Sequence, residues 1–121
     1  MNYQITRQSK VVLISLAGSL TREHLPALEK LREELAALEF DCVILHFKGV
    51  SDRADRNVLP QLALLQKAVR DKGARVCLAS LTLGLRQNLE LRGVVRRDEC
   101  FEDLPQTLQW LARIGARPAA A

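Results

Sequence analysis

The sequence predicts an α/β fold in which a mixed sheet of four or five strands packs with about four helices, in the order ββαβαβα(β)α. Two observations lead to this fold class. Short runs rich in valine, leucine and isoleucine alternate with segments whose leucines recur every three or four residues, as in amphipathic helices. Strand–helix–strand units produce parallel neighbours, whereas the opening pair of strands predicts an antiparallel edge.

Each element is predicted from its own pattern. Strands are expected at residues 2–7, 10–16, 42–47, 75–79 and, as a short fifth strand, 100–101. Helices are expected at residues 23–38, 58–72, 83–92 and 104–114. The dipeptide Ala17-Gly18 is expected to turn the chain, Lys72-Gly73 to end the second helix, and Asp103 to cap the last one.

The size and composition indicate one globular domain. The chain has 121 residues, and we expect a single domain over residues 1–115 and a disordered tail over residues 116–121. Hydrophobic residues make up 48% and charged residues 26% of the chain, and no apolar run approaches the roughly 18 residues that span a membrane. The net charge of +4 comes from scattered basic residues, so nucleic-acid binding is not favoured.

The three cysteines indicate a reducing compartment. Cys42, Cys77 and Cys100 are odd in number and widely spaced, a pattern that predicts neither a disulfide framework nor a metal site. The first two fall in predicted buried strands, where cysteine packs as a small hydrophobic residue. With no apolar signal segment at the N-terminus, the expected location is cytoplasmic.

Residues 41–62 are the most informative part of the chain. The apolar run at residues 42–45 passes into a short polar turn, and an amphipathic helix pattern begins at Val58. Helix N-termini present unpaired backbone N–H groups, and binding sites often form there. This segment therefore predicts a functional loop between a buried strand and a helix.

The segment resembles the STAS domain, the module of bacterial anti-sigma factor antagonists. The family's strand motif, Leu-Asp-Leu-x-Gly-Val, is matched by residues 45–50, and its loop and helix start, Asp-Ser-Ser-Gly-Leu-Gly-x-Leu, by residues 55–62. Shorter matches follow the family's order at residues 18–20, 72–76 and 89–94. The resemblance covers nearly the whole chain and implies a STAS-like single domain.

The serine that this family phosphorylates is absent here. The resemblance places it on Arg56, or on Asp55 when residues are counted forward from Val50 without a gap. We prefer Arg56, because an extra residue is accommodated more easily in a loop than in a helix. In either register residues 54–57 carry no hydroxyl, and the nearest, on Ser51, is in the wrong place to cap the helix. Asp55 either caps the helix or acts in recognition. In the register counted forward from Val50 it would be a fixed charge resembling a phosphoserine, whereas in the preferred register Arg56 brings the opposite charge.

We expect a regulatory protein-interaction module without catalytic residues, cofactor or metal. The resemblance implies a protein partner such as an anti-sigma factor that is also a serine kinase, and it leaves a homodimer open. The partner is expected to contact the loop at residues 51–57 and the helix behind it. The predicted contact residues are Ser51, Asp52, Arg53, Asp55, Arg56 and Asn57.

Two alternatives belong to a different class of function. Arg53 and Arg56 flank the predicted helix N-terminus, which suits a phosphate or carboxylate, so the domain could bind an anion or nucleotide. A related alternative is the small STAS subunit of a lipid-transport ATPase complex.

An enzyme is least favoured, because the chain has no Gly-rich phosphate loop and no Gly-x-Ser-x-Gly motif. His46 is interpreted as a packed strand residue and His24 as solvent-facing.

Overall fold

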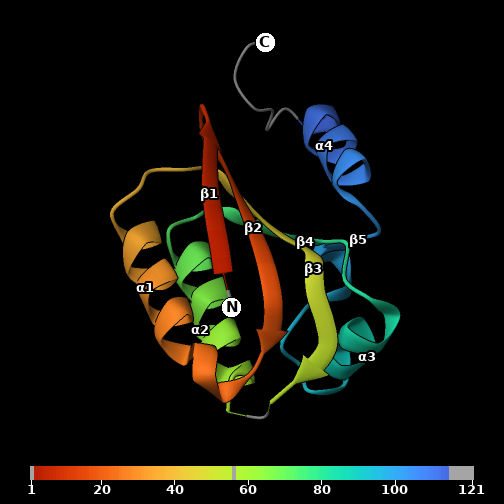
Figure 1. Cartoon of the computed structure of the whole chain (residues 1–121). Coiled ribbons are helices and arrows are strands. Elements are labelled where there is room, and N and C mark those ends of the chain that lie inside the picture. Colours follow the sequence, from red (N-terminus) through yellow and green to blue (C-terminus); the bar gives the residue numbers. More distant parts are fainter. Residues whose placement is uncertain (1, 56, 115–121) are drawn as a thin grey trace.

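Five strands form one mixed sheet in the order β1-β2-β3-β4-β5 (Figure 1). The computed structural model describes residues 2–55 and 57–114, with the backbone alone at residues 2 and 52–54. The strands are β1 (Asn2–Gln8), β2 (Val11–Leu20), β3 (Cys42–Ala54), β4 (Arg75–Ala79) and β5 (Cys100–Phe101). Only the β1–β2 pair is antiparallel within this sheet. The predicted fold class is confirmed.

The helices are α1 (Leu25–Ala36), α2 (Leu59–Asp71), α3 (Leu83–Leu91) and α4 (Leu104–Arg113), with short 3-10 helices η1 (Arg22–His24) and η2 (Arg97–Glu99). The predicted helix at residues 23–38 is therefore shorter than expected, because its first turn is η1 and it ends at Ala36. Leu38, beyond that end, still packs against the core. None of the helices in the described part of the chain is long and apolar enough to span a membrane.

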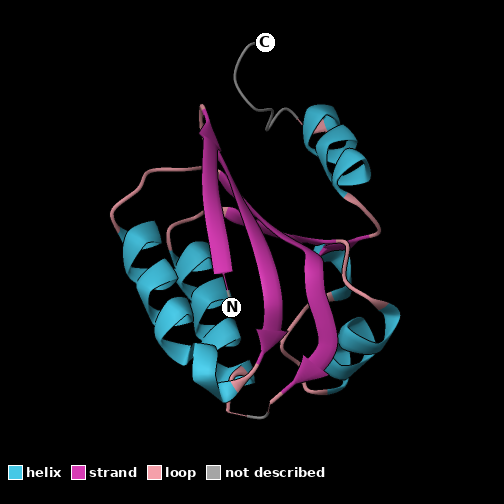
Figure 2. Ribbon diagram, viewed as in Figure 1, coloured by secondary structure: helices cyan, strands magenta, loops and turns pink. Residues whose placement is uncertain are grey.

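The two faces of the sheet are covered differently. Leucines of α1, α2 and α3 pack with Val43 and Leu45 of β3 in the larger core. The alternate side chains of β3, Cys42 and Ile44, point to the opposite face and pack with Leu111 of α4. Figure 2 shows α1 and α2 packed side by side, with α4 well separated from them. The face covered by α1–α3 is called the helix face below, and the other is called the α4 face.

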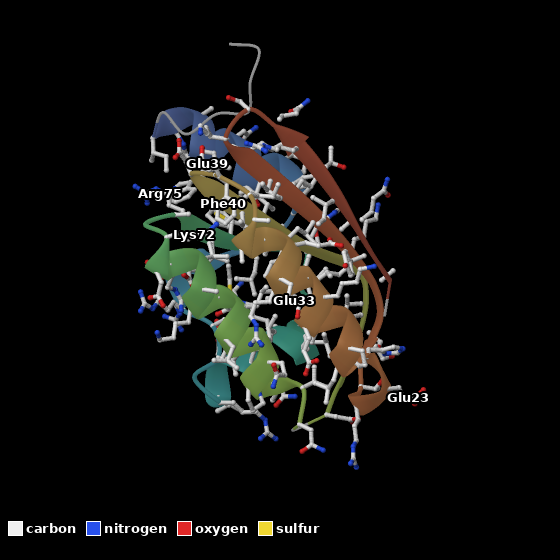
Figure 3. The ribbon with its side chains drawn as sticks, turned by 90° about the vertical axis from the view of Figure 1, so that its left-hand side faces the viewer. Glu23, Glu33, Glu39, Phe40, Lys72 and Arg75 are labelled. Carbon is white, nitrogen blue, oxygen red and sulfur yellow. The ribbon has the colours of Figure 1, made fainter. Side chains whose placement is uncertain are left out.

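Helices α2 and α3 end at the glycines where the sequence predicts their ends. Gly73 and Gly93, which follow α2 and α3, have φ of +79° and +68°, a conformation that favours glycine. Lys72 Nζ donates to the carbonyls of Leu35, Ala36 and Leu38 at 3.1, 3.0 and 2.7 Å, so it also closes α1. Its ammonium lies 5.0 Å from the centre of the Phe40 ring (Figure 3).

Strand β2 contradicts the turn predicted at Ala17-Gly18. The strand continues through both residues to Leu20, with two shifts of register against β3. Gly18 has φ of +107°, and this conformation lets the strand bulge where a turn was expected. On the neighbouring strand, a Cβ at Gly49 would lie 3.1 Å from the Cβ of Ala17, so glycine permits the close approach of β3.

Strand β3 is likewise longer than predicted, and its two halves have different neighbours. Residues 42–46 pair with β2 on one side and β4 on the other. Beyond His46, β3 pairs with β2 alone and reaches Ala54, which is opposite Leu20. The second half of β3 therefore extends past the rest of the parallel sheet and ends at the candidate site.

Candidate functional site

The connection from β3 to α2 is a short turn next to the end of β2. Asp55 N donates to Leu20 O at 2.8 Å, which continues the β2–β3 pairing by one residue. Val58 N then donates to Asp55 O at 3.0 Å, and α2 begins at Leu59. The predicted loop at residues 51–57 is therefore wrong in its first part, because residues 51–54 belong to β3. The pairing with β2 continues through them, so they remain extended.

The Asp55 carboxylate joins this turn to the start of η1. Its Oδ2 accepts a hydrogen bond from Arg22 N at 3.0 Å, and the side chain is half-buried. Asp55 is not the N-cap of α2, which was one of its two predicted roles. The N-cap of α2 is Val58, and it makes no side-chain hydrogen bond. Asp55 instead satisfies a backbone N–H at the beginning of the other helical segment at this end of the sheet.

A second group of polar side chains lies at the end of β2. Ser19 Oγ and Ser51 Oγ are 3.0 Å apart and link β2 to β3. His24 Nδ1 lies 2.9 Å from both Ser19 O and Thr21 Oγ1, and the ring is half-buried. The prediction that His24 faces solvent is wrong. Its signal in the sequence was the hydroxyl of Thr21 three residues earlier, a common spacing for bonds at the start of a helix.

The predicted contact residues divide into three groups. Ser51 and Asn57 are exposed and Asp55 is half-buried. Asp52 and Arg53 lie on the last part of β3, where the backbone is extended. Arg56 lies outside the described residues, and the structure leaves its predicted role untested.

Helix α2 adds an apolar surface that the sequence reasoning missed. Pro60 in its first turn is exposed, and Leu64, one turn later, has 44% of its surface exposed. Residues four apart lie on the same side of a helix, so the two exposed side chains share one side of α2. The available signal was that Leu64 falls outside the apolar stripe formed by Val58, Leu62 and Leu65.

Titratable groups elsewhere do not form a metal site. Within residues 2–55 and 57–114, no three histidine, cysteine or acidic side chains are grouped as ligands of an ion. Cys42 and Cys77 are buried with their Sγ atoms 4.0 Å apart, as expected for packed thiols. The hydrogen bond between them and their burial hold the pKa of the Cys77 thiol far above its usual range. Both pack as small hydrophobic residues.

The backbone is similar to several solved structures, whereas no protein-family model and no curated protein matches the sequence. The anti-sigma factor antagonist SpoIIAA in its unphosphorylated form is 15% identical, with a TM-score of 0.73 over 94% of this chain and 97% of that one. RsbS of Moorella thermoacetica is 12% identical, with a TM-score of 0.77 over 95% and 98%. The chain has the STAS fold.

Transport proteins with the same fold are also similar to the chain. A sulfate transporter family protein from Wolinella succinogenes is 14% identical, with a TM-score of 0.78 over 91% of each chain. At these identities the likeness establishes the STAS fold and leaves the function to be argued from the site. The resemblance drawn from the sequence motifs is confirmed at the level of the fold.

Proposed function

We propose that this STAS-fold domain is a regulatory protein-interaction module, similar in role to an anti-sigma factor antagonist and acting in the cytoplasm. The observation that carries the proposal is the near-complete mutual coverage with SpoIIAA, 94% of this chain and 97% of that one. The partner class that follows is an anti-sigma factor with serine-kinase activity. The domain meets it through residues 51–57 and the first two turns of α2.

The chemistry of this surface supports docking. Leu64 and Pro60 supply exposed apolar area on a rigid helix, and Ser51 and Asn57 supply exposed polar groups in the segment before it. An apolar centre with a polar rim is the usual composition of a protein–protein interface. The bond from Arg22 N holds Asp55 against η1, so this residue loses less freedom when a partner binds.

The chemistry of residues 54–57 also implies that binding is not switched there by phosphorylation. Ala54, Asp55, Arg56 and Asn57 have no hydroxyl to accept a phosphoryl group. Incubation with an anti-sigma serine kinase and ATP, followed by phosphopeptide mapping, should find no phosphate in this segment. Phosphate mapped to any of these four residues would disprove the claim that binding is not switched there.

The interface is tested with Leu64→Glu and a matched control on another helix. Leu91 of α3 is 88% exposed, so Leu91→Glu makes the same chemical change on a different surface. We expect Leu64→Glu to weaken binding of the purified kinase about 10-fold or more, because a charge would be desolvated within the interface, and Leu91→Glu to leave it unchanged. Equal affinity of both variants and wild type at equal thermal stability would refute docking through α2.

The charge on the turn is tested separately with Arg56→Glu. Charges at the rim of an interface act mainly on the association rate and are screened by salt. We expect Arg56→Glu to unfold within about 0.5 kcal/mol of wild type and to associate more slowly at low ionic strength. Arg92→Glu, an exposed arginine on the chain after α3, is the control. Identical association rates for the two variants and wild type at low salt would contradict the role of this turn.

A second candidate function is anion or nucleotide binding by a transport-associated STAS domain. Two observations favour it: α2 begins without a side-chain cap, and the sulfate transporter family protein shares the fold with a TM-score of 0.78. Uncapped backbone N–H groups at a helix start attract anions. A rise in melting temperature with sulfate or ATP, lost in Asn57→Asp, would favour this function over protein docking. No shift at millimolar ligand would exclude it.

A further inference from the structure

The α4 face contains a polar cluster at the point where the parallel strands β2, β3 and β4 lie side by side. His46 of β3 is opposite Ser15 of β2 and Ala79 of β4, and its side chain follows Cys42 and Ile44 on the α4 face. Ser15 and His46 are half-buried, unlike the buried residues beneath α4. Two residues further along the strands, Ala17 and Lys48 are exposed, so the cluster opens to solvent on that side.

Ser80 brings a hydroxyl directly to this histidine. It follows the last residue of β4, and its Oγ lies 3.1 Å from His46 Nε2. Ser80 and His46 are both half-buried, so the pair is partly accessible to solvent. The two residues form a Ser–His pair that joins β3 to the turn after β4.

The backbone at Ser80 is strained in the way that is common at functional positions. Its φ is +62°, in the left-handed region that serine adopts rarely. The conformation is held by the bond from Ser80 N to Phe101 O of β5, at 3.2 Å. Helix α3 begins three residues later, at Leu83. A serine in a strained turn between a strand and a helix is the arrangement that exposes the nucleophile of many acyl-transferring enzymes, although the turn here is longer and lacks their flanking glycines.

The protonation state of His46 suits the role of a base. Burial, with a smaller contribution from the charge of Lys48, lowers the pKa of the imidazole below its usual value. The ring is therefore neutral at pH 7, and Nε2 can accept the proton of the Ser80 hydroxyl when Nδ1 carries the ring proton.

We propose that Ser80 is a nucleophile activated by His46 and that it accepts an acyl group from an activated ester. Ser80 Oγ forms a bond to the acyl carbon while its proton moves to His46 Nε2. The bond from the acyl carbon to the leaving oxygen then breaks, and the leaving group departs with its electron pair. The product is an ester on Ser80, and the proton is released from His46 to solvent or to the leaving group.

The ester would mark a surface other than the one proposed for partner docking. Ser80 lies beyond the end of β4, on the far side of β3 from β2, whereas the Asp55 turn adjoins the end of β2. The inference is therefore independent of the proposed function. It gives the domain a covalent modification site in place of the serine that is absent from residues 54–57.

The test uses p-nitrophenyl acetate and the full chain at pH 7.5, with the acetylated residue identified by peptide mass spectrometry. We expect acetyl on Ser80, none at this position in Ser80→Ala, and a rate at least about 100-fold lower in His46→Gln, the lower range for loss of a general base. Ser51, an exposed hydroxyl whose partner is another serine, is the control within the same molecule and should not be acetylated faster than free serine.

The pH dependence provides a second measurement on the wild-type protein, in case His46→Gln does not fold. Burial and then the charge of Lys48 lower the pKa of His46, while the facing Ser15 and Ser80 are neutral. The acetylation rate of Ser80 should be level near pH 7 and fall below pH 6.5 as the imidazole gains a proton. Absence of acetyl on Ser80, an unchanged rate in folded His46→Gln, or a rate that does not fall in acid would each overturn the proposal.

Discussion

The helix face and the α4 face of the sheet differ in both packing and chemistry. On the helix face, side chains of all three covering helices and of β2, β3 and β4 join into one continuous apolar core. On the α4 face, one short helix covers only the first residues of the parallel strands, around Cys42, Ile44 and Cys77. The later residues on that face, Ser15 and His46, are polar and half-buried.

The helix face therefore supplies most of the stability, whereas the α4 face can present polar groups to solvent. Burial of apolar area supplies most of the stability of a small domain, and the helix face contains most of that area. The α4 face is only partly covered, so it can present polar groups to solvent without an unsatisfied buried atom. His46 is placed there by the same alternation that sends Leu45 and Phe47 into the core, and Ser80 meets it from the turn that follows β4.

The sharpest test of the comparison is the same substitution on each face. Leu62 and Leu111 are both fully buried, the first on α2 in the helix-face core and the second on α4, where it packs against the sheet. We expect Leu62→Ala to lower the free energy of unfolding by about 4 kcal/mol and Leu111→Ala by about 2.5 kcal/mol, because α4 can move into the cavity more easily than α2 can. Equal losses in denaturant unfolding would show that the two faces are equally rigid.

Lys72 tests how the helix face is held together at its edge. It donates to three carbonyls at and beyond the end of α1, and Lys72→Met removes those bonds while keeping an unbranched side chain that is only one atom shorter. The expected loss is about 1.5 kcal/mol. Lys67→Met removes an exposed ion pair with Asp71 on the same helix and should cost less than about 0.5 kcal/mol. Similar losses for the two variants in thermal unfolding would contradict a linking role for Lys72.

The cysteines report on how firmly α4 covers its face. Cys42 and Cys77 are buried beneath α4 and the pKa of Cys77 is strongly raised, so neither should react with a thiol reagent in the native state. Cys100 is half-buried, and burial raises the pKa of its thiol, so it should react slowly. Titration with a disulfide reagent should find one slow thiol in the native protein and three after denaturation. Fast native reaction that persists in Cys100→Ser would mean that α4 detaches readily.

The smallest expected effect is the acid sensitivity contributed by the open part of the α4 face. Because the folded pKa of His46 is below its usual 6.5, the unfolded chain binds the proton more tightly. The stabilising contribution of neutral His46 is therefore complete above pH 6.5 and is lost as the pH falls through the folded pKa. Unfolding free energies measured between pH 5 and 8 should fall less steeply in acid for His46→Gln than for wild type. Parallel curves would show that His46 is solvated.

The helices and most strand starts followed from patterns within single segments. Spacing of three and four placed the leucines of α1, α2 and α3, and local signals such as Asp103 before α4 marked helix ends, since its carboxylate accepts from Gln106 N at 2.8 Å. These features depend on neighbours in the chain, so the sequence alone was sufficient for them. The order of elements and the motif matches were also sufficient to indicate the STAS fold.

The errors came from pairing between distant segments. Gly18 was interpreted as a turn because a local pattern cannot show that β3 continues alongside it to Ala54. For the same reason, the partner of Asp55 could not be predicted, since Arg22 N is brought to it only when β2 and β3 end side by side. The Ser80–His46 contact likewise joins residues 34 positions apart.

The sequence by itself determined the fold class, the helix stripes, the burial of Cys42 and Cys77 as small hydrophobic residues, and the absence of a hydroxyl at residues 54–57. All of these depend on the identity and spacing of residues. The tertiary structure alone decided the true length of β3, the exposure of Leu64 and the meeting of His46 with Ser80. Those depend on strand register and on which surface each helix covers, and both are fixed only when the sheet assembles, because that is when distant segments come together.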